Sequence, residues 1–314
     1  MFGSGAFAIP ILDALAVLRG ITVVGVVTAA DRPAGRRQEM TAVPVARRAR
    51  ELGLVLLQPA SLRSGSGPSE VARLGPDLGI LADYGRIIPE ALLALPRAGI
   101  LNVHPSLLPR HRGASPIAAA ILAGDQDSGV TIIAMDAGID TGPAVASERL
   151  SLDGTETAPE LEVRLASLGA RLLAGTIGPW LEGRLSAIPQ DDAAASLTRP
   201  LRREDGRLDP GRSAVELERH VRALLPWPGA FLETDLGRLT VDRAAVGAAA
   251  TGDEAGTVVA DGDGLALATR EGRLRMLDVG LAGGRRMAAA ELRRGRPGLV
   301  GLRAHVGPVS PSAR

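Results

Sequence analysis

The sequence predicts an α/β protein with a doubly wound, mostly parallel sheet, followed by a second, smaller β-rich domain. In the first half, short apolar, β-branched runs alternate with longer segments of helical character. A polar, proline-bounded stretch then follows at residues 189–200, and beyond it short strand-like runs are separated by Gly and Asp turns. We therefore expect one domain in residues 1–188, a linker in 189–205 and a small β-barrel in 206–314.

The elements of the first domain follow from apolar runs and helix signals. Strands are predicted at residues 21–28, 54–57, 78–82, 100–103 and 130–135, and helices at 9–18, 43–52, 89–95 and 115–123. The last helix has Ser115 as N-cap, proline at its first position and Gly124 after its end. A long helical pattern from residue 158 to about 185 closes this domain.

The second domain is predicted to contain one helix and several short strands. The helix covers residues 213–225, and the strands cover 230–233, 239–241, 256–259, 265–269 and 274–279. Such short strands with tight turns favour a small antiparallel barrel.

The start of the sequence has the turn of a first strand but little of the strand. Gly3-Ser-Gly5 precedes a helix, and only Met1 and Phe2 stand before it. In a doubly wound sheet the first strand is central and paired on both edges. We expect about five further apolar residues to precede Met1 in the working protein, since a strand typically has about that length.

Composition excludes several kinds of chemistry. The 314 residues are 46% hydrophobic and include neither cysteine nor lysine, which excludes disulfides, thiol nucleophiles, Schiff-base lysines and Walker A loops. The 4 histidines are too scattered to suggest a metal site, so we expect no metal. With no apolar run of about 18 residues and no basic leader, we expect a soluble, cytoplasmic protein without membrane contact.

The net charge of +1 hides a basic end of the chain. Residues 270–314 contain ten arginines against three carboxylates, a local charge of +7. Arginine pairs with phosphate through a planar fork, so a nucleic-acid partner is one interpretation. A solvated arginine-rich surface is the other, and charge by itself favours it.

Polar side chains gather where two neighbouring strands end. Asn102 and His104 lie two residues apart after an apolar run, which places both on one face near the carboxyl end of a strand, where open α/β sheets bind ligands. An amide that stabilises an oxyanion and an imidazole that moves a proton make a usable catalytic pair. Asp136 and Asp140 follow the next strand, and one of them could orient the histidine. A structural histidine and simple turn chemistry remain the alternatives, and for Asp136 we prefer the turn.

Several long motifs resemble a known family. Asn102-Val-His-Pro-Ser-Leu-Leu-Pro109, Gly129-Val-Thr-Ile132 and Met135-Asp-Ala-Gly-Ile-Asp-Thr-Gly142 resemble the signature of the 10-formyltetrahydrofolate-dependent formyltransferases. Motifs at residues 31–36, 57–59, 82–89, 203–209, 226–230 and 286–295 are similar to those of the branch that acts on methionyl initiator tRNA. The resemblance covers nearly the whole chain. It implies a Rossmann-like formyltransferase fold followed by an OB-like, tRNA-binding barrel.

The resemblance also implies the reaction and the roles of residues. A formyl group would pass from 10-formyltetrahydrofolate, the co-substrate, to the amino group of methionine on initiator tRNA, supporting translation initiation. Asn102 would polarise the formyl oxygen, His104 would move protons and stabilise the oxyanion, and Asp140 would hold His104. The residues expected to bind the folate are Ser106, Leu107, Leu108, Pro109, Tyr84, Gly85 and Ile88.

The partner implied by the resemblance is tRNA, and the protein is expected to be a monomer. The residues expected to bind tRNA are Arg36, Arg37, Arg203, Arg285, Arg286, Arg293 and Arg294. Two alternatives stay open at this point. One is an N-formyltransferase that acts on an amino-sugar nucleotide, and the other is a non-catalytic relative that binds folate or tRNA without turnover.

Overall fold

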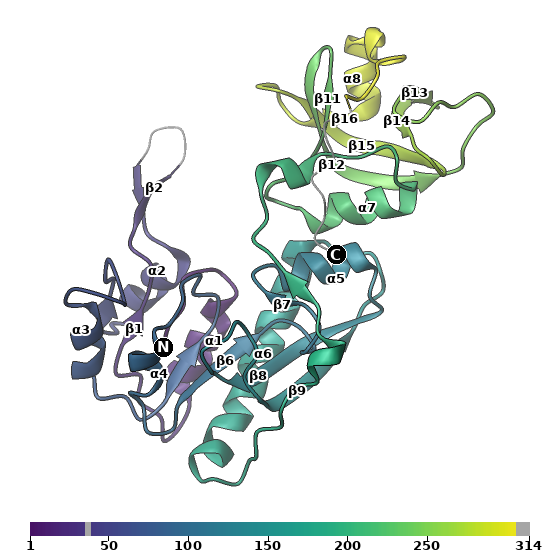
Figure 1. The fold of residues 1–314 in the computed structure, drawn as a ribbon. Coiled ribbons are helices and arrows are strands. Elements are labelled where there is room, and N and C mark those ends of the chain that lie inside the picture. Colours follow the sequence, from purple (N-terminus) through teal and green to yellow (C-terminus); the bar gives the residue numbers. More distant parts are fainter. Residues whose placement is uncertain (35–38, 306–314) are drawn as a thin grey trace. The chain divides into compact units, whose positions relative to one another are not determined.

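The computed structural model describes residues 1–34 and 39–305, which form two compact units. The first unit contains Met1–Pro116, Gln126–Leu152 and Glu160–Arg199. The second contains Ile117–Asp125, Asp153–Pro159 and the chain from Pro200 onward. Each unit has its own sheet (Figure 1).

The first unit is built on one mixed sheet. Strand β1 (Val26–Val27) pairs in parallel with β4 (Leu56–Leu57), and β5 (Gly79–Leu81) pairs in parallel with β6 (Ile100–His104). Phe2 joins the two pairs through parallel bridges to Val27 and Leu81. Beyond β6 lie β8 (Asp127–Ala134) and β9 (Ala144–Ser151), both antiparallel to their neighbours. The order across the sheet is therefore β4, β1, Phe2, β5, β6, β8, β9.

The sheet is mixed, because β8 runs antiparallel to both of its neighbours, β6 and β9, whereas the other pairings are parallel as predicted. A parallel return to the same sheet needs a crossover that covers that sheet, usually a helix. Helix α5 (Pro116–Ala123), which connects β6 to β8, belongs to the second compact unit instead. The chain re-enters the sheet in the opposite direction. Strand β9 was not predicted, because its exposed Ser, Glu and Arg residues dilute the apolar pattern.

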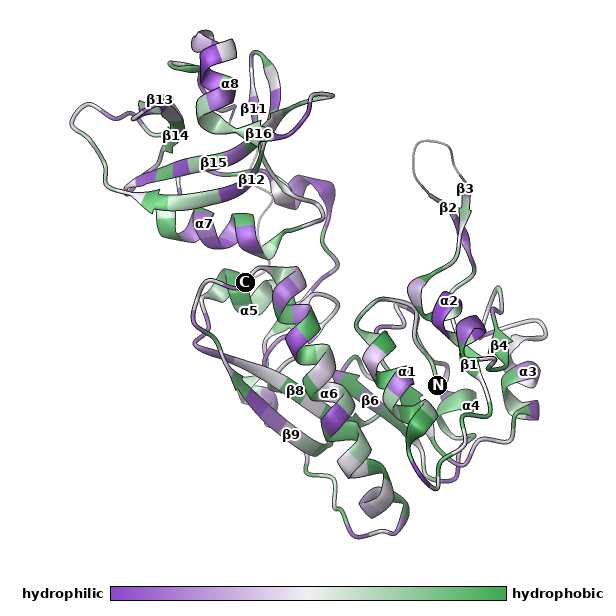
Figure 2. Ribbon diagram, turned by 180° about the vertical axis from the view of Figure 1, so that it is seen from behind, coloured by the Kyte–Doolittle hydropathy of each residue, from purple (hydrophilic) through white to green (hydrophobic). Residues whose placement is uncertain are grey.

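The helices of the first unit follow the sequence pattern closely. Helices α1 (Ala8–Val17), α2 (Pro44–Glu51), α4 (Glu90–Leu93) and α6 (Ala158–Leu181) confirm the prediction, and α3 (Gly67–Arg73) was missed. Figure 2 shows the contrast between the hydrophobic α1 and the hydrophilic α2. Helix α6 packs so closely on the sheet that a Cβ on Gly169 would lie 2.9 Å from Val103 Cγ1. This helix covers the face of β6 that bears Val103, which leaves the opposite face to Asn102 and His104.

The first residues of the chain occupy the centre of the sheet. The amide of Phe2 donates to the carbonyl of Ile80 (2.7 Å), and the amide of Gly3 donates to that of Val27 (3.1 Å). A cavity of about 860 Å³ lies at the amino ends of the parallel strands, lined by residues 20–25 and 74–80 among others. The expectation that further strand residues precede Met1 stays a prediction.

Two short strand pairs complete the first unit. Strands β2 (Arg32–Ala34) and β3 (Glu39–Thr41) pair as antiparallel partners, and β7 (Arg112–Gly113) pairs in parallel with β10 (Leu197–Thr198). Strand β10 lies within the stretch predicted as a linker, together with the 3-10 helices η1 (Asp192–Ala194) and η2 (Arg203–Gly206). Part of that stretch is therefore ordered against the first unit.

The second unit has an antiparallel sheet with helices α7 (Ala214–Ala223) and α8 (Ala289–Gly295) and the 3-10 helix η3 (Pro297–Leu299). Its strand order is β11 (Ala230–Thr234), β12 (Gly237–Gly247), β15 (Arg273–Leu281), β14 (Gly264–Ala268) and β13 (Val258–Asp261), and β16 (Met287–Ala288) pairs with β15. A buried aliphatic core that includes Leu217, Leu239, Leu267 and Leu274 holds these elements together. Between residues 200 and 305, the strands form no closed barrel, so the expected OB-like closure is not confirmed.

Candidate active site

Strand β6 places the predicted catalytic pair on one buried face. Asn102 and His104 are 5% and 4% exposed, and they alternate with Leu101 and Val103, which face α6 and the core. The antiparallel register places Thr131 of β8 directly opposite His104. A polar row in such an apolar strand needs partners, because an unpaired buried amide or imidazole would cost stability.

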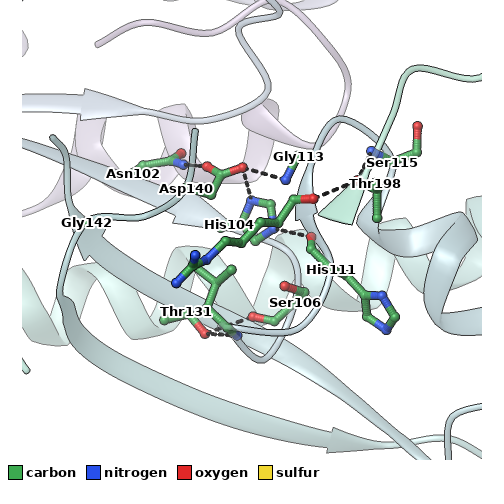
Figure 3. Close-up of polar contacts among 12 residues, drawn as sticks. Asn102, His104, Ser106, His111, Gly113, Ser115, Thr131, Asp140, Gly142 and Thr198 are labelled. Carbon is green, nitrogen blue, oxygen red and sulfur yellow. Dashed lines mark hydrogen bonds and ion pairs between the residues drawn. The ribbon is translucent and has the colours of Figure 1, made fainter. Parts of the chain in front are cut away.

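Asp140 supplies those partners from the loop after β8. Its Oδ1 accepts a hydrogen bond from Asn102 Nδ2 (2.9 Å), and its Oδ2 accepts one from the amide of Gly113 (2.9 Å). The same Oδ2 lies 3.6 Å from His104 Nδ1. Figure 3 shows the three side chains turned toward one another. The structure thus brings together the three residues that the sequence predicts as catalytic.

The other carboxylate of this loop has a different role. Asp136 Oδ1 accepts hydrogen bonds from the amide of Gly138 (3.0 Å) and the hydroxyl of Thr141 (2.7 Å). Asp136 is exposed and closes the turn, which agrees with the turn chemistry preferred for it from the sequence.

The hydrogen bonds of His104 define its tautomer. Its Nε2 lies 3.0 Å from the carbonyl oxygen of His111, and a carbonyl only accepts, so Nε2 carries the hydrogen. In the neutral ring Nδ1 is then the basic nitrogen, on the side of Asp140. Burial lowers the pKa of His104 below its usual range, and the Asp140 carboxylate opposes that shift. His104 is therefore neutral near pH 7 and able to accept a proton.

Backbone strain gathers around this cluster. Within residues 1–34 and 39–305, the non-glycine residues with positive φ are Asp83 (45°), His111 (59°) and Asp140 (55°). Asp83 follows β5, whereas His111 and Asp140 lie in the loops after β6 and β8 and both contact His104. Such conformations cost free energy and persist where the surrounding contacts hold them, as they do at many functional sites.

The loop after His104 is held by a threonine that the sequence analysis missed. Thr131 Oγ1 donates to the carbonyl of Ser106 (2.8 Å) and accepts from the amide of Leu108 (3.1 Å). Ser106 Oγ donates to the carbonyl of Arg110 (2.7 Å), so the loop is also closed from within. Threonine is common in buried strands, and the Gly129-Val-Thr-Ile132 motif did not by itself indicate this role.

The residues expected to bind folate fall into two groups. Ser106 is buried, and Leu107, Leu108 and Pro109 are half-buried in the loop just described. The side chains of Tyr84 and Ile88 lie in a core cluster with Phe2, whose ring centroid is 5.7 Å from that of Tyr84. Gly85 is exposed, with a φ of 70°. Contacts from Tyr84 and Ile88 to a ligand would therefore come through the backbone.

The arginines expected to bind tRNA are scattered over the sequence, and those in the described residues differ in their partners. Arg36 and Arg37 lie outside the described residues. Arg203, Arg285, Arg286 and Arg294 are exposed. Arg285 and Arg286 pair with Glu291 and Asp242, and Arg293 donates to the carbonyls of Gly262 (2.7 Å) and Gly264 (3.1 Å).

The described residues also bear on metal binding and on membrane-spanning helices. Residues 1–34 and 39–305 contain no group of three or more His, Asp or Glu side chains that could hold a metal ion. In the same residues, no helix is long and apolar enough to cross a membrane.

The fold and the site together define a class of protein. Residues 1–177 match the family model for formyl transferases, and residues 200–297 match the model for the formyl transferase C-terminal domain. The N-formyltransferase from Helicobacter canadensis, in complex with folinic acid and dTDP-3-aminofucose, has the same fold. It superposes with a TM-score of 0.64 at 15% identity, over 91% of this chain and 97% of that one. The chain is a formyl transferase.

The relatives narrow the family further. The methionyl-tRNA formyltransferase of Roseiflexus sp. (strain RS-1) is 42% identical over 93% of this chain and 90% of its own length. That of Halorhodospira halophila (strain DSM 244 / SL1) is 43% identical over 94% of each chain. The chain belongs to the methionyl-tRNA formyltransferase family.

Proposed function

We propose that this protein transfers a formyl group from 10-formyltetrahydrofolate to the amino group of methionine on initiator tRNA. The observation that carries the proposal is the cluster of Asn102, His104 and Asp140 at the end of β6. It occurs in a chain more than 40% identical, over most of its length, to proteins named for this activity.

Each catalytic side chain has a role that its contacts support. Asn102 uses one amide hydrogen on Asp140, and its second hydrogen would donate to the formyl oxygen as negative charge develops there. His104 Nδ1 would accept the proton that the attacking amine loses, and Asp140 would stabilise the imidazolium so formed. Since Nε2–H already donates to His111, we assign the oxyanion to Asn102 and the proton to His104.

The atoms balance in a simple acyl transfer. The methionine nitrogen forms a bond to the formyl carbon, and the bond between that carbon and the folate nitrogen breaks. The amine proton taken up by His104 would return to the departing folate nitrogen. His104 is regenerated in its neutral form, so the cycle needs no oxidant, reductant or metal.

The residues present fit the folate co-substrate. A flat heteroaromatic ring with polar edges needs apolar contact surface and backbone hydrogen-bonding groups at one place. Leu107, Leu108 and Pro109 offer half-buried apolar side chains on a loop fixed by Thr131, and the backbone of residues 83–88 follows the adjacent parallel strand. These two loops would hold the folate beside Asn102.

The second unit would bind the tRNA. Its arginine-rich surface suits phosphates, and the exposed arginines at positions 203, 285, 286 and 294, together with the half-buried Arg293, are the residues that we assign to it. We further propose that the protein acts as a monomer in the cytoplasm, where translation begins, and that Arg36 and Arg37 also contact the tRNA.

The test is a formylation assay with 10-formyltetrahydrofolate and methionyl initiator tRNA. We expect the wild-type protein to formylate the methionine and His104→Ala to lose about 100-fold or more in kcat, because the amine proton has no acceptor. The exposed histidine variant His305→Ala is the matched control and should keep full activity.

A folded, folate-binding protein that leaves the tRNA unformylated would overturn the assignment. The same assay with a dTDP-linked amino sugar in place of tRNA then identifies the acceptor class. Formylation of the sugar would move the protein to the amino-sugar branch, and no turnover with either acceptor would indicate a non-catalytic role.

A further inference from the structure

We propose that Gln190 is a positioning residue for formyl transfer, which holds the loop that carries Asp140 in its working geometry. This inference rests on the proposed function. It concerns a residue from the stretch predicted as a linker, which nothing in the motif around Asn102 and His104 points to.

The side-chain amide of Gln190 joins two backbone carbonyls of the Asp140 loop. Its Nε2 donates to the carbonyl of Asp140 itself (2.8 Å) and to that of Gly142 (2.7 Å). Asp140 has a φ of 55°, a strained conformation for a residue with a side chain. A Cβ on Gly142 would lie 2.0 Å from the carbonyl oxygen of Ala134, so the chain after Asp140 is also tightly confined. The two hydrogen bonds thus hold a loop that would otherwise relax.

The other end of the same amide joins this loop to the strand that faces it. Gln190 Oε1 accepts from Arg112 Nε (3.0 Å), and Arg112 Nη2 pairs with Asp192 (2.8 Å). The Arg112 side chain is only 5% exposed, so it is committed to these contacts and braces the loop. To bind a folate carboxylate or a tRNA phosphate, the Arg112 guanidinium would have to leave these contacts.

Strand β7 and the residue before it carry the two backbone groups that contact the catalytic side chains. The carbonyl of His111, just before β7, accepts from His104 Nε2, and the amide of Gly113 donates to Asp140 Oδ2. The segment 196–198 fixes this strand. The amide of His111 donates to Ser196 Oγ (2.9 Å), and the amide of Arg112 donates to the carbonyl of Ser196 (2.9 Å). The stretch from Gln190 to Thr198 therefore holds both sides of the catalytic cluster, with Gln190 at their junction.

The first experiment compares Gln190→Leu with wild type in steady-state formylation. We expect kcat to fall by about 10- to 100-fold while the KM values for folate and tRNA change less than about threefold, because the role proposed for Gln190 is to position Asp140 and not to bind a substrate. Gln126→Leu, the same change at an exposed glutamine of the same unit, is the control and should keep wild-type kcat. Equal kcat for Gln190→Leu and wild type, with both proteins folded, overturns the proposal.

A second variant separates the donor role of Gln190 from its contact with Arg112. Gln190→Glu keeps an oxygen acceptor for Arg112 but has no hydrogen to donate to the carbonyls of Asp140 and Gly142. We expect Gln190→Glu to be as impaired as Gln190→Leu. Recovery of wild-type kcat in Gln190→Glu would show that Arg112 is what matters and would overturn the assignment of Gln190.

A third measurement does not depend on any acceptor. The protein has 4 histidines, so the ring of His104 can be followed by NMR during a pH titration. The Asp140 carboxylate raises the pKa of His104 against the effect of burial, and His111 is the other titratable neighbour. If Gln190→Leu lets Asp140 move away, the midpoint for His104 moves to lower pH, whereas a merely structural residue would leave it in place.

These measurements distinguish failure of the positioning role of Gln190 from failure of the proposed function. If wild type is inactive on tRNA but Gln190→Leu moves the His104 midpoint, the positioning role stands and the proposed acceptor fails. If wild type is active and Gln190→Leu changes neither kcat nor the midpoint, the positioning role fails by itself.

Discussion

At the scale of single residues, one carboxylate organises the site. Asp140 accepts from Asn102 and from the Gly113 amide, and it faces Nδ1 of His104. Its charge is held near a buried, neutral imidazole, where the local dielectric is low and charge interactions are strong. The proton-accepting ability of His104 therefore depends on the charge of Asp140 more than on its shape.

Asp140→Asn tests this dependence on charge. The variant keeps the size of the side chain and an acceptor oxygen, but it removes the negative charge that would stabilise the imidazolium. We expect kcat to fall by roughly 100-fold to 10⁴-fold. We also expect a loss of about 1–3 kcal/mol in stability, because the amide NH2 replaces an oxygen that accepts from Asn102 or from the Gly113 amide. Steady-state formylation measures kcat, and thermal unfolding of wild type and Asp140→Asn measures the change in stability.

Asp136→Asn is the matched control for that experiment. It makes the same change in the same loop, at a carboxylate that closes the turn with Gly138 and Thr141. It should keep activity within about threefold of wild type, since it removes no contact with the catalytic pair. A loss in Asp136→Asn as large as that in Asp140→Asn would refute a specific role for Asp140.

At the scale of elements, the pairing of β7 with β10 depends on a glycine. Gly113 has a φ of 105°, and a Cβ there would lie 2.3 Å from the carbonyl oxygen of Thr198. Only glycine permits both this conformation and this approach. Because the Gly113 amide also donates to Asp140, the element and the site share one residue.

Gly113→Ala should disrupt both the pairing of β7 with β10 and the hydrogen bond from the Gly113 amide to Asp140. We expect it to destabilise the protein by about 1–3 kcal/mol and to lower kcat at least tenfold, since β7 must move and the amide with it. Urea unfolding and steady-state kinetics measure the two effects.

The contrasting variant is Gly175→Ala in α6. Gly175 is exposed and helical, and nothing lies within 4 Å of a Cβ placed there. This change should stabilise by about 0.5–1 kcal/mol, because glycine is a poor residue for a helix interior. If Gly113→Ala is no less stable than wild type, the steric argument for Gly113 is wrong.

At the scale of the whole molecule, a buried histidine of the second unit makes stability depend on pH. Burial lowers the pKa of His220 to about 4, with Arg212 acting in the same direction. The unfolded chain takes up this proton near pH 6.5, but the folded protein does not until about pH 4. Stability is therefore complete above pH 6.5 and is lost as the pH falls from 6.5 toward 4, by about 3 kcal/mol in all.

His220→Leu should remove most of this dependence. We expect the free energy of unfolding of the variant to change little between pH 7.5 and pH 5, apart from the part due to His104, whose pKa burial also lowers. Urea unfolding at the two pH values, together with amide hydrogen exchange in α7, measures this change in the free energy of unfolding. His305→Ala, at an exposed histidine, should keep the wild-type dependence. The same slope in His220→Leu as in wild type would contradict the assignment.

The charge of the second unit predicts how activity depends on salt. We expect kcat/KM for the tRNA to fall steeply as salt rises, with a log–log slope of about −0.7 to −0.9 for each phosphate contact. Arg294→Ala should reduce that slope by about 1 and leave the KM for folate unchanged. The control is Arg97→Ala, which changes an exposed arginine of the first unit that pairs with Asp77. This variant should keep the wild-type slope. Equal slopes for Arg294→Ala and wild type would exclude that residue from the tRNA contact.

Much of the fold was predictable because it rests on local patterns. The helices α1, α2, α6 and α7 and the strand β6 follow from apolar periodicity and capping residues that neighbours in sequence supply. The direction of β8 was not predictable, since an apolar, β-branched run does not indicate which way its strand lies in the sheet. The apolar pattern of the sequence did not indicate strand β9. It also did not indicate that the sheet of the second unit stays open.

By itself, the sequence determined the chemistry of the site. Asn102 and His104 share a face because side chains alternate along a strand, and the motifs around them indicated the family that the relatives confirm. Only the tertiary structure decided how that pair is held. Hydrogen bonds between segments as much as 50 residues apart set the tautomer of His104 and join Gln190 to the carbonyl of Asp140. They also connect Thr131 to the loop after His104. Such bonds leave no periodic trace, because their geometry exists only after the sheet has brought those segments together.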